Sequence, residues 1–282
     1  WPERRESLRK EGPLNLKTIF RKVLWFTDVG RVFRWLALSR FRRNRPFLLF
    51  EGRNYTYGEV AHQAARYAHF FRAARMARVS DGRVGQGEPL AIGMYQENPP
   101  EFVFAFFGAA LSGDVLFGIN TGFRGETLAS CIKQARITLV LADASRVPMV
   151  ESVLPLLEGL GPEDLLLVDG EEEGVEGKVR TVEEAIAACG ADTEPRQRAR
   201  IDIFSPLIVI YTSGTTGAPK GVPLSHFKIL GAGVITRHRI HLTGKDRGYV
   251  AMPLFHANAW YLGILPVLMA GGSFLLKRRF SA

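Results

Sequence analysis

Cysteine is scarce in this sequence, and its scarcity excludes two kinds of scaffold. The 282-residue chain has two cysteines, Cys131 and Cys189, each inside an apolar stretch. Two isolated cysteines provide neither a disulfide framework nor a zinc site, so we interpret both as reduced core thiols of a protein that faces the cytosol. Disorder is not expected either, because 46% hydrophobic and 23% charged residues are ordinary for a globular protein with a sizeable core.

The basic N-terminal segment contains no apolar run that could span a bilayer. Residues 1–45 hold 13 Lys and Arg against four Asp and Glu, an excess that equals the formal charge of the whole chain, +9. Between Lys17 and Arg45, apolar residues alternate with basic ones, and every charge-free run is far shorter than the roughly 20 residues of a spanning helix. No small-residue cleavage site follows, which argues against a signal peptide.

Two interpretations of this basic amphipathic segment remain open. A basic helix with tryptophan at its apolar edge is typical of helices on an anionic membrane surface, which predicts peripheral membrane contact through residues 17–45. The same pattern fits a helix that packs on its own domain with solvated arginines. Nucleic acid is not an expected partner, because no recognition motif accompanies the charge. We therefore expect a cytoplasmic protein or one peripheral to the cytoplasmic face of a membrane.

From residue 46 onward, short apolar runs alternate with helical patterns. The predicted strands are residues 47–50, 55–57, 89–94, 115–119, 137–141, 165–168 and 207–210. The predicted helices are residues 58–78, 99–111, 126–134, 147–157 and 181–188, and another begins at Ser225-His226. Strands that are continuous apolar runs are typical of sheets buried on both faces. The pattern therefore predicts an α/β fold with mostly parallel sheets flanked by helices, and solvated connections at residues 171–176 and 194–200.

One stretch follows an apolar strand with a loop rich in hydroxyl groups and glycine, Tyr211-Thr-Ser-Gly-Thr-Thr-Gly-Ala-Pro-Lys-Gly221. Gly214 and Gly217 allow backbone N–H groups to face an anion without obstruction. Lys220 adds a positive charge suited to a triphosphate. Hydroxyl groups that donate to phosphate or bind Mg²⁺ come from Thr212, Ser213, Thr215 and Thr216. The stretch therefore predicts a phosphate-binding loop, with an ordinary strand-to-loop connection as the alternative.

The loop is not a Walker A motif, because Lys220 follows Pro219 and precedes Gly221. It resembles the signature loop of the adenylate-forming superfamily, which contains acyl- and aryl-CoA synthetases, peptide-synthetase adenylation domains and firefly luciferase. The resemblance implies that residues 212–217 and Lys220 bind the β- and γ-phosphates of ATP. It also implies that Thr212 helps to hold Mg²⁺ and that Lys220 meets the leaving pyrophosphate.

Further matches extend the resemblance over about residues 47–282. Met252-Pro-Leu-Phe-His-Ala-Asn-Ala-Trp260 is similar to the family's Pro-Leu-Phe-His segment, which implies that His256 lies beside the acyl and adenylate pocket. Other matches are residues 55–59, 97–102 and 107–113. Residues 119–128 and 277–282 favour the branch of fatty-acid transport proteins, which are long- or very-long-chain acyl-CoA synthetases.

The resemblance implies the N-terminal part of the large domain of adenylate-forming enzymes, here residues 46–282. The family's Tyr-Gly-x-Thr-Glu segment, ribose-binding aspartate, hinge and C-terminal domain with the catalytic lysine have no match in this sequence. We therefore expect an incomplete domain whose C-terminal portion is absent. We expect such a fragment to be inactive alone.

Three functions remain as hypotheses. The first is a long-chain fatty acid–CoA ligase that uses ATP, Mg²⁺ and coenzyme A, with Lys220 and His256 as catalytic residues. The second is a membrane-associated module for fatty-acid uptake and lipid transport without complete catalysis. The third is a phosphate-binding protein of another class, such as a kinase, which would release ADP instead of AMP.

Overall fold

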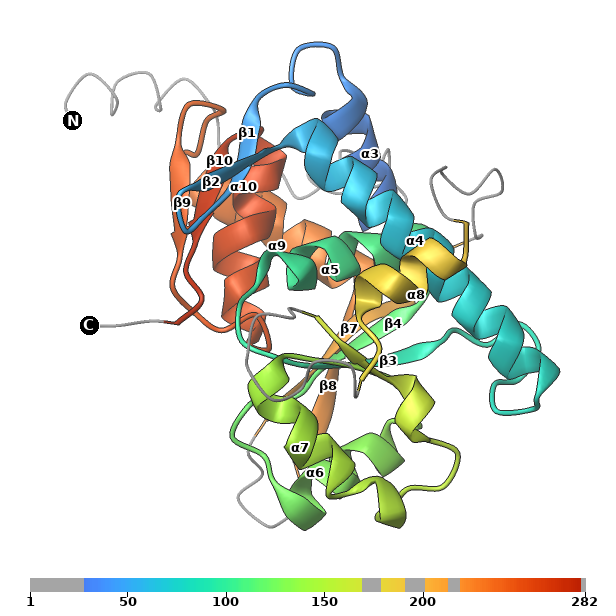
Figure 1. Cartoon of the computed structure of the whole chain (residues 1–282). Helices are drawn as coiled ribbons and strands as arrows, with labels where there is room; N and C mark the ends of the chain where they lie inside the picture. Colours follow the sequence, from blue (N-terminus) through green and yellow to red (C-terminus); the bar gives the residue numbers. More distant parts are fainter. Residues whose placement is uncertain (1–27, 169–178, 191–200, 213–218, 280–282) are drawn as a thin grey trace.

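The computed structural model describes residues 28–168, 179–190, 201–212 and 219–279 (Figure 1). These residues contain two sheets, which we call the first and the second sheet. The first has the order β2-β1-β10-β9, made of Arg53–Thr56, Pro46–Phe50, Ser273–Leu276 and Arg247–Val250. The second has the order β6-β5-β3-β4-β7-β8, made of Leu165–Leu167, Leu139–Ala142, Ala91–Tyr95, Val115–Gly118, Pro206–Thr212 and Lys220–Ser225.

All neighbouring strands run parallel except the hairpins β1–β2 and β7–β8. The described α-helices are α3 Val29–Leu38, α4 Tyr57–Ser80, α5 Pro100–Ser112, α6 Gly125–Gln134, α7 Val147–Glu151, α8 Val182–Ala188, α9 His226–Arg239 and α10 Leu265–Ala270. A π-helical turn, η4, spans Ala259–Ile264 immediately before α10. The predicted α/β fold with mostly parallel sheets flanked by helices is therefore confirmed.

Two apolar cores lie on the two faces of the second sheet. One face packs against α4 and α5, and the other against α6 and α7 (Figure 1). Helix α5 is buried on nearly all sides, as expected of a helix that lies between two sheets. Its ends follow local rules, with Pro100 and Glu101 in the first turn and Gly113 left-handed (φ 80°) at the C-cap.

Helix α3 answers part of the question about the basic segment. Asp28 caps it by accepting a hydrogen bond from the N–H of Arg31 at 2.7 Å. Its apolar face, including Val29, Phe33 and Leu36, is buried in the core beside α4, α5 and α9. Over residues 29–38 the helix therefore packs on its own fold. Residues 1–27 of the basic segment lie outside the described residues. The predicted connections 171–176 and 194–200 also lie outside them.

One predicted helix was too long, and one strand was not predicted. The helix predicted over residues 147–157 ends at Glu151, and a 3₁₀ turn follows at Leu154–Leu156. Pro155 has no N–H to donate to the carbonyl of Glu151, so the helix cannot continue. Residues 220–225 form strand β8, which the sequence pattern did not predict. No helix among the described ranges has the length and apolar character needed to cross a membrane.

A buried histidine connects α3 to α9 and should make stability depend on pH. His226 Nδ1 accepts the N–H of Val29 at 3.2 Å, and burial lowers the pKa of His226 to about 4 from 6.5, against the raising effects of Asp28 and Asp202. The folded state therefore favours neutral imidazole. Below pH 6.5 the unfolded chain binds the proton more readily, so stability is lost as the pH falls from about 6.5 to about 4.

We expect this single group to contribute up to about 3 kcal/mol of that loss. The measurement is urea unfolding of the wild type and the His226→Gln variant at pH 7 and pH 4.5. The glutamine keeps a hydrogen-bond acceptor but does not titrate, so its free energy of unfolding should change less between the two pH values. Equal changes in both proteins would show that His226 is not responsible.

Candidate active site

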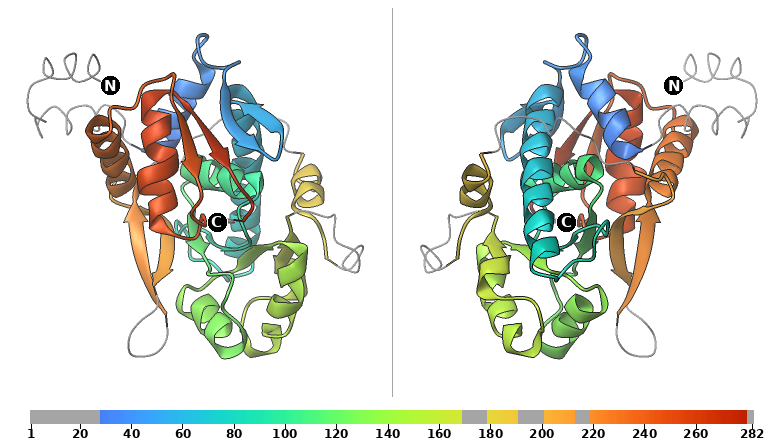
Figure 2. Two further views of the ribbon diagram at one scale, coloured as in Figure 1. Left: turned by 90° about the vertical axis from the view of Figure 1, so that its left-hand side faces the viewer. Right: turned by 90° about the vertical axis from the view of Figure 1, so that its right-hand side faces the viewer.

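The β7–β8 hairpin carries both ends of the predicted phosphate loop. Tyr211 pairs with Gly221, and Thr212 pairs with Lys220, in antiparallel register. Thr212 Oγ1 lies 3.4 Å from the carbonyl oxygen of Lys220, to which it donates. Both residues are exposed, and Figure 2 shows the two strands side by side at one end of the molecule. Thr212 and Lys220 therefore lie side by side where the two strands of the hairpin lead into the predicted loop.

The remaining predicted nucleotide-binding residues lie outside the described residues. They are Ser213, Gly214, Thr215, Thr216 and Gly217. Their assignment stays a prediction, whereas the described flanks fix where the segment starts and ends. It starts at the carboxyl end of β7 and returns to the same sheet, and ligands of open α/β sheets bind outside the carboxyl ends of strands.

Tyr211 fixes the carboxyl end of β7 against the neighbouring helix. Its hydroxyl donates to the carbonyl of Cys131 in α6 at 2.9 Å, and its ring meets Phe123 edge to face. Burial raises the pKa of Tyr211, so the hydroxyl stays protonated and keeps donating. These contacts therefore hold the end of β7 in place where the predicted loop begins. The sequence alone indicates no separate role for this tyrosine.

His256 lies at the same edge of the second sheet. The residue before it, Phe255, packs over β4 so closely that a Cβ atom built on Gly118 would lie 3.1 Å from the Phe255 Cα. Gly118 in turn pairs with Ile210, two residues before Thr212. His256 is half-buried, and burial lowers its pKa, which favours neutral imidazole. The structure thus brings the two motifs found in the sequence to the carboxyl ends of adjacent strands.

A buried ion-pair cluster occupies the carboxyl ends of β3 and β5. Arg146 donates to both oxygens of Asp143, at 2.8 and 2.7 Å, and to Glu97 at 2.6 Å. Arg279 Nε lies 3.5 Å from Glu97. Because the Arg146 guanidinium is already bound by two carboxylates, the cluster is suited to fixing loops rather than to binding phosphate. The sequence offered no periodic signal for this cluster.

The described residues offer few ligands for a Mg²⁺ ion. Among them no group of three or more His, Cys, Asp or Glu side chains could hold a metal ion. Mg²⁺ in nucleotide sites usually keeps several waters and binds substrate phosphates with one or two protein ligands. The exposed Thr212 hydroxyl oxygen fits one such ligand, since it retains lone pairs while donating to Lys220.

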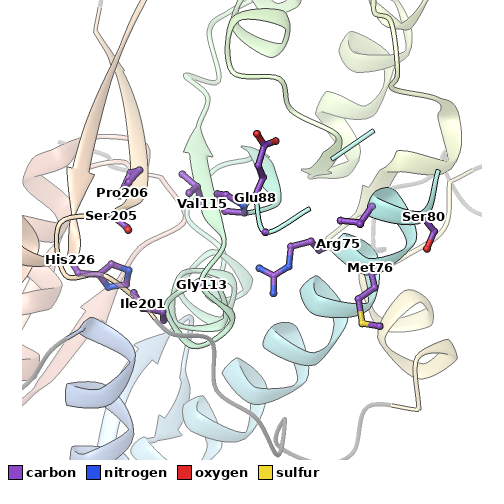
Figure 3. A pocket seen from close by; sticks show the side chains of 13 residues that line it. Arg75, Met76, Ser80, Glu88, Gly113, Val115, Ile201, Ser205, Pro206 and His226 are labelled. Carbon is purple, nitrogen blue, oxygen red and sulfur yellow. The ribbon is translucent and has the colours of Figure 1, made fainter. Parts of the chain in front are cut away.

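The cavity of about 750 Å³ in Figure 3 lies at the opposite edge of the sheet. Its lining includes Val115 and Pro206, which begin β4 and β7. Arg75 also lines it, but its guanidinium is paired with Asp114 at 2.6 Å. This cavity is therefore separated from the candidate active site by the length of the strands.

Comparisons with known proteins identify the family of the chain. The family described as AMP-binding enzyme matches residues 35–282. Long-chain fatty acid transport protein 6 of Homo sapiens is 30% identical over 250 residues, which cover 88% of this chain and 38% of that protein. A medium/long-chain-fatty-acid–CoA ligase of Mycobacterium tuberculosis is 34% identical over 216 residues, which cover 76% of this chain and 38% of that protein.

Solved structures show the same fold at lower identity. A benzoate CoA ligase from Burkholderia xenovorans LB400 superposes with a TM-score of 0.71 at 19% identity, covering 88% of this chain and 45% of that one. Identity at this level supports the fold alone. The chain spans 38% of the length of each of the two curated relatives named above.

Proposed function

The chain belongs to the AMP-binding enzyme family, and from this membership we propose that the protein containing it activates a long-chain fatty acid with ATP and then forms acyl-CoA. Its relatives named as a fatty acid transport protein and a fatty-acid–CoA ligase support this substrate class. The observation that carries the proposal is the β7–β8 hairpin, which holds Lys220 opposite Thr212 at the carboxyl edge of the second sheet.

In the proposed reaction, an oxygen of the fatty-acid carboxylate attacks the α-phosphorus of ATP. The bond from the α-phosphorus to the bridging oxygen breaks, and acyl-adenylate and pyrophosphate form. The thiolate of coenzyme A then attacks the acyl carbon and releases AMP. In this proposal the ammonium group of Lys220 meets the charge that grows on the leaving pyrophosphate, and a positioned cation of this kind stabilises the transition state.

The two other assigned residues have narrower roles in this proposal. Mg²⁺, when bound, would neutralise phosphate charge, and Thr212 is the described residue that would help to hold it. His256 would orient the carboxylate or the adenylate by hydrogen bonding from a neutral imidazole. No covalent enzyme intermediate is needed, so the protein acts by positioning and electrostatics.

The test is exchange of radiolabelled pyrophosphate into ATP by the longest natural protein that contains this sequence. We expect exchange that depends on a fatty acid and on Mg²⁺, with the highest rates for long-chain acids in a series of chain lengths. AMP should be the product when coenzyme A is added. Release of ADP with phosphate transfer to an acceptor would support the kinase hypothesis, and absence of acid-dependent exchange would reject the ligase.

We also propose a membrane contact at the end of α3, as a second property of the same protein. Trp35, Leu38 and Phe41 are 60%, 47% and 73% exposed, and Arg40 lies over the Phe41 ring at 4.7 Å. Exposed aromatic groups beside arginine suit the interface of an anionic bilayer.

Sedimentation with phosphatidylserine vesicles tests this contact. The Trp35→Ser/Phe41→Ser variant should lose most of the binding, whereas Met76→Ser, which removes another exposed apolar side chain on α4, should bind like the wild type. Equal binding of all three proteins would exclude the contact.

A further inference from the structure

Asn98 is a buried polar residue that joins the two sheets beside His256. It follows strand β3 of the second sheet and is 2% exposed. Its carboxamide makes three hydrogen bonds, all to backbone atoms more than 150 residues away along the chain. Asn98 lies in the matched segment of residues 97–102, and the sequence alone indicates no role for it.

The first of these bonds fixes the segment that carries His256. Asn98 Oδ1 accepts the N–H of Leu254 at 2.7 Å. The carbonyl of the same residue, Leu254, accepts from Trp260 Nε1 at 2.7 Å. Trp260 is fully buried and stacks on Phe106, with ring centroids 3.8 Å apart. The side chains of Asn98 and Trp260 thus hold both polar backbone groups of Leu254, two positions before His256.

The other two bonds use the amide donors of Asn98. Nδ2 donates to the carbonyl of Met252 at 3.3 Å and to that of Lys277 at 3.2 Å. Met252 comes shortly after β9, and Lys277 follows β10, so the carboxyl ends of two strands of the first sheet are tied to the end of β3. Aspartate has nearly the same shape but cannot donate when ionised, and it would place a carboxylate oxygen against two carbonyl oxygens.

We propose that Asn98 is a positioning residue that, with Trp260, sets the place of His256 and thereby the binding of the fatty-acid carboxylate. The inference rests on the proposed function. Phosphate binding depends on a different element, the β7–β8 hairpin, which Asn98 does not contact through any of these hydrogen bonds. Loss of Asn98 should therefore affect the acid more than ATP, which a general loss of stability would not do.

The kinetic test uses Asn98→Asp and Trp260→Phe in the longest natural protein that contains this chain. Asn98→Asp removes the donor to the carbonyls of Met252 and Lys277, and Trp260→Phe removes the donor to the carbonyl of Leu254. Both variants keep most of the original side-chain volume. We expect KM for the fatty acid to rise about 10-fold or more, since small misplacements at a reacting centre can cost as much as about 100-fold. KM for ATP should stay within about twofold of the wild type, because Asn98 and Trp260 hold the segment of His256 and not the β7–β8 hairpin.

Tyr57→Phe is the matched control. It removes a buried hydrogen bond of 2.7 Å to the carbonyl of Gly272, before the other end of β10. We expect it to lower the melting temperature without changing either KM. If both test variants keep the wild-type KM for the acid, or change both KM values alike, the positioning role is overturned.

A structural readout separates this inference from the proposed function. Hydrogen–deuterium exchange of a peptide covering residues 252–260 should become at least about 10-fold faster in Asn98→Ala, because the amide of Leu254 loses its acceptor. Exchange in residues 206–212 should be unchanged. Wild-type protein without acid-dependent activity would reject the ligase, whereas unchanged exchange at residues 252–260 would reject the role of Asn98.

Discussion

Replacing Lys220 with alanine should slow fatty-acid-dependent ATP–pyrophosphate exchange by about 100-fold to 1,000-fold, the effect of removing one positioned group that stabilises transition-state charge. Lys220 begins strand β8 directly opposite Thr212, so the two residues flank the predicted phosphate loop. The loss should appear mainly in kcat, because charge on the pyrophosphate grows as the bond to the α-phosphorus breaks.

Lys228→Ala is a close control for this experiment. Lys228 is an exposed lysine of the first turn of α9, and its Nζ lies 3.4 Å from the carbonyl of Pro223 within the hairpin. The Lys228→Ala substitution removes the same charge at the far end of β8, so the rate of ATP–pyrophosphate exchange should stay within about twofold of the wild type. Equal rates in Lys220→Ala and Lys228→Ala would remove Lys220 from the catalytic assignment.

Asp164→Ala should lower the free energy of unfolding by about 3–5 kcal/mol, the range for breaking a buried ion pair from one side. Asp164 is 1% exposed and accepts hydrogen bonds from Arg78, from Arg83 at 2.6 Å and from the N–H of Gly161 at 3.0 Å. Arg78 is 6% exposed, and burial lowers its pKa, an effect that Asp164 opposes. Without Asp164 the buried guanidinium keeps its charge but loses its partner.

Urea unfolding followed by circular dichroism measures this loss. Asp81→Ala removes the exposed partner of Arg83 and should leave the unfolding midpoint nearly unchanged. The double variant Arg78→Met/Asp164→Leu should recover much of the stability, because apolar groups of similar size can replace a buried pair. A single variant as stable as the wild type would show that the pair contributes little.

Local sequence patterns correctly predicted helix starts, because the hydrogen bonds of a helix cap join residues within one turn of each other. Thr181 and Glu184 form the predicted capping box of α8, with both bonds present at 3.1 and 2.8 Å. Ser225 caps α9 where the sequence placed a helix start. Pro155 lies inside the helix predicted over residues 147–157, and its missing N–H already indicates a helix end near this position.

The candidate site was only partly visible before the structure. The phosphate loop and His256 lie in contiguous motifs, so their residue types could be recognised one segment at a time. Strand β8 was not predicted because Val222 and Pro223 are both exposed and show no apolar pattern. Its antiparallel pairing with β7, which places Lys220 opposite Thr212, depends on the partner strand rather than on its own sequence.

Residue order and composition were enough to establish the alternation of strands and helices, the family and the two motifs, since each depends on neighbours in the chain. They could not give the strand order, the burial of α3 or the role of Asn98. Asn98 selects partners 154 and 179 residues away, and His226 meets Val29 across 197 residues. Such pairs form because the whole core packs in one arrangement, and no local propensity specifies which distant backbone groups that arrangement brings within hydrogen-bonding distance.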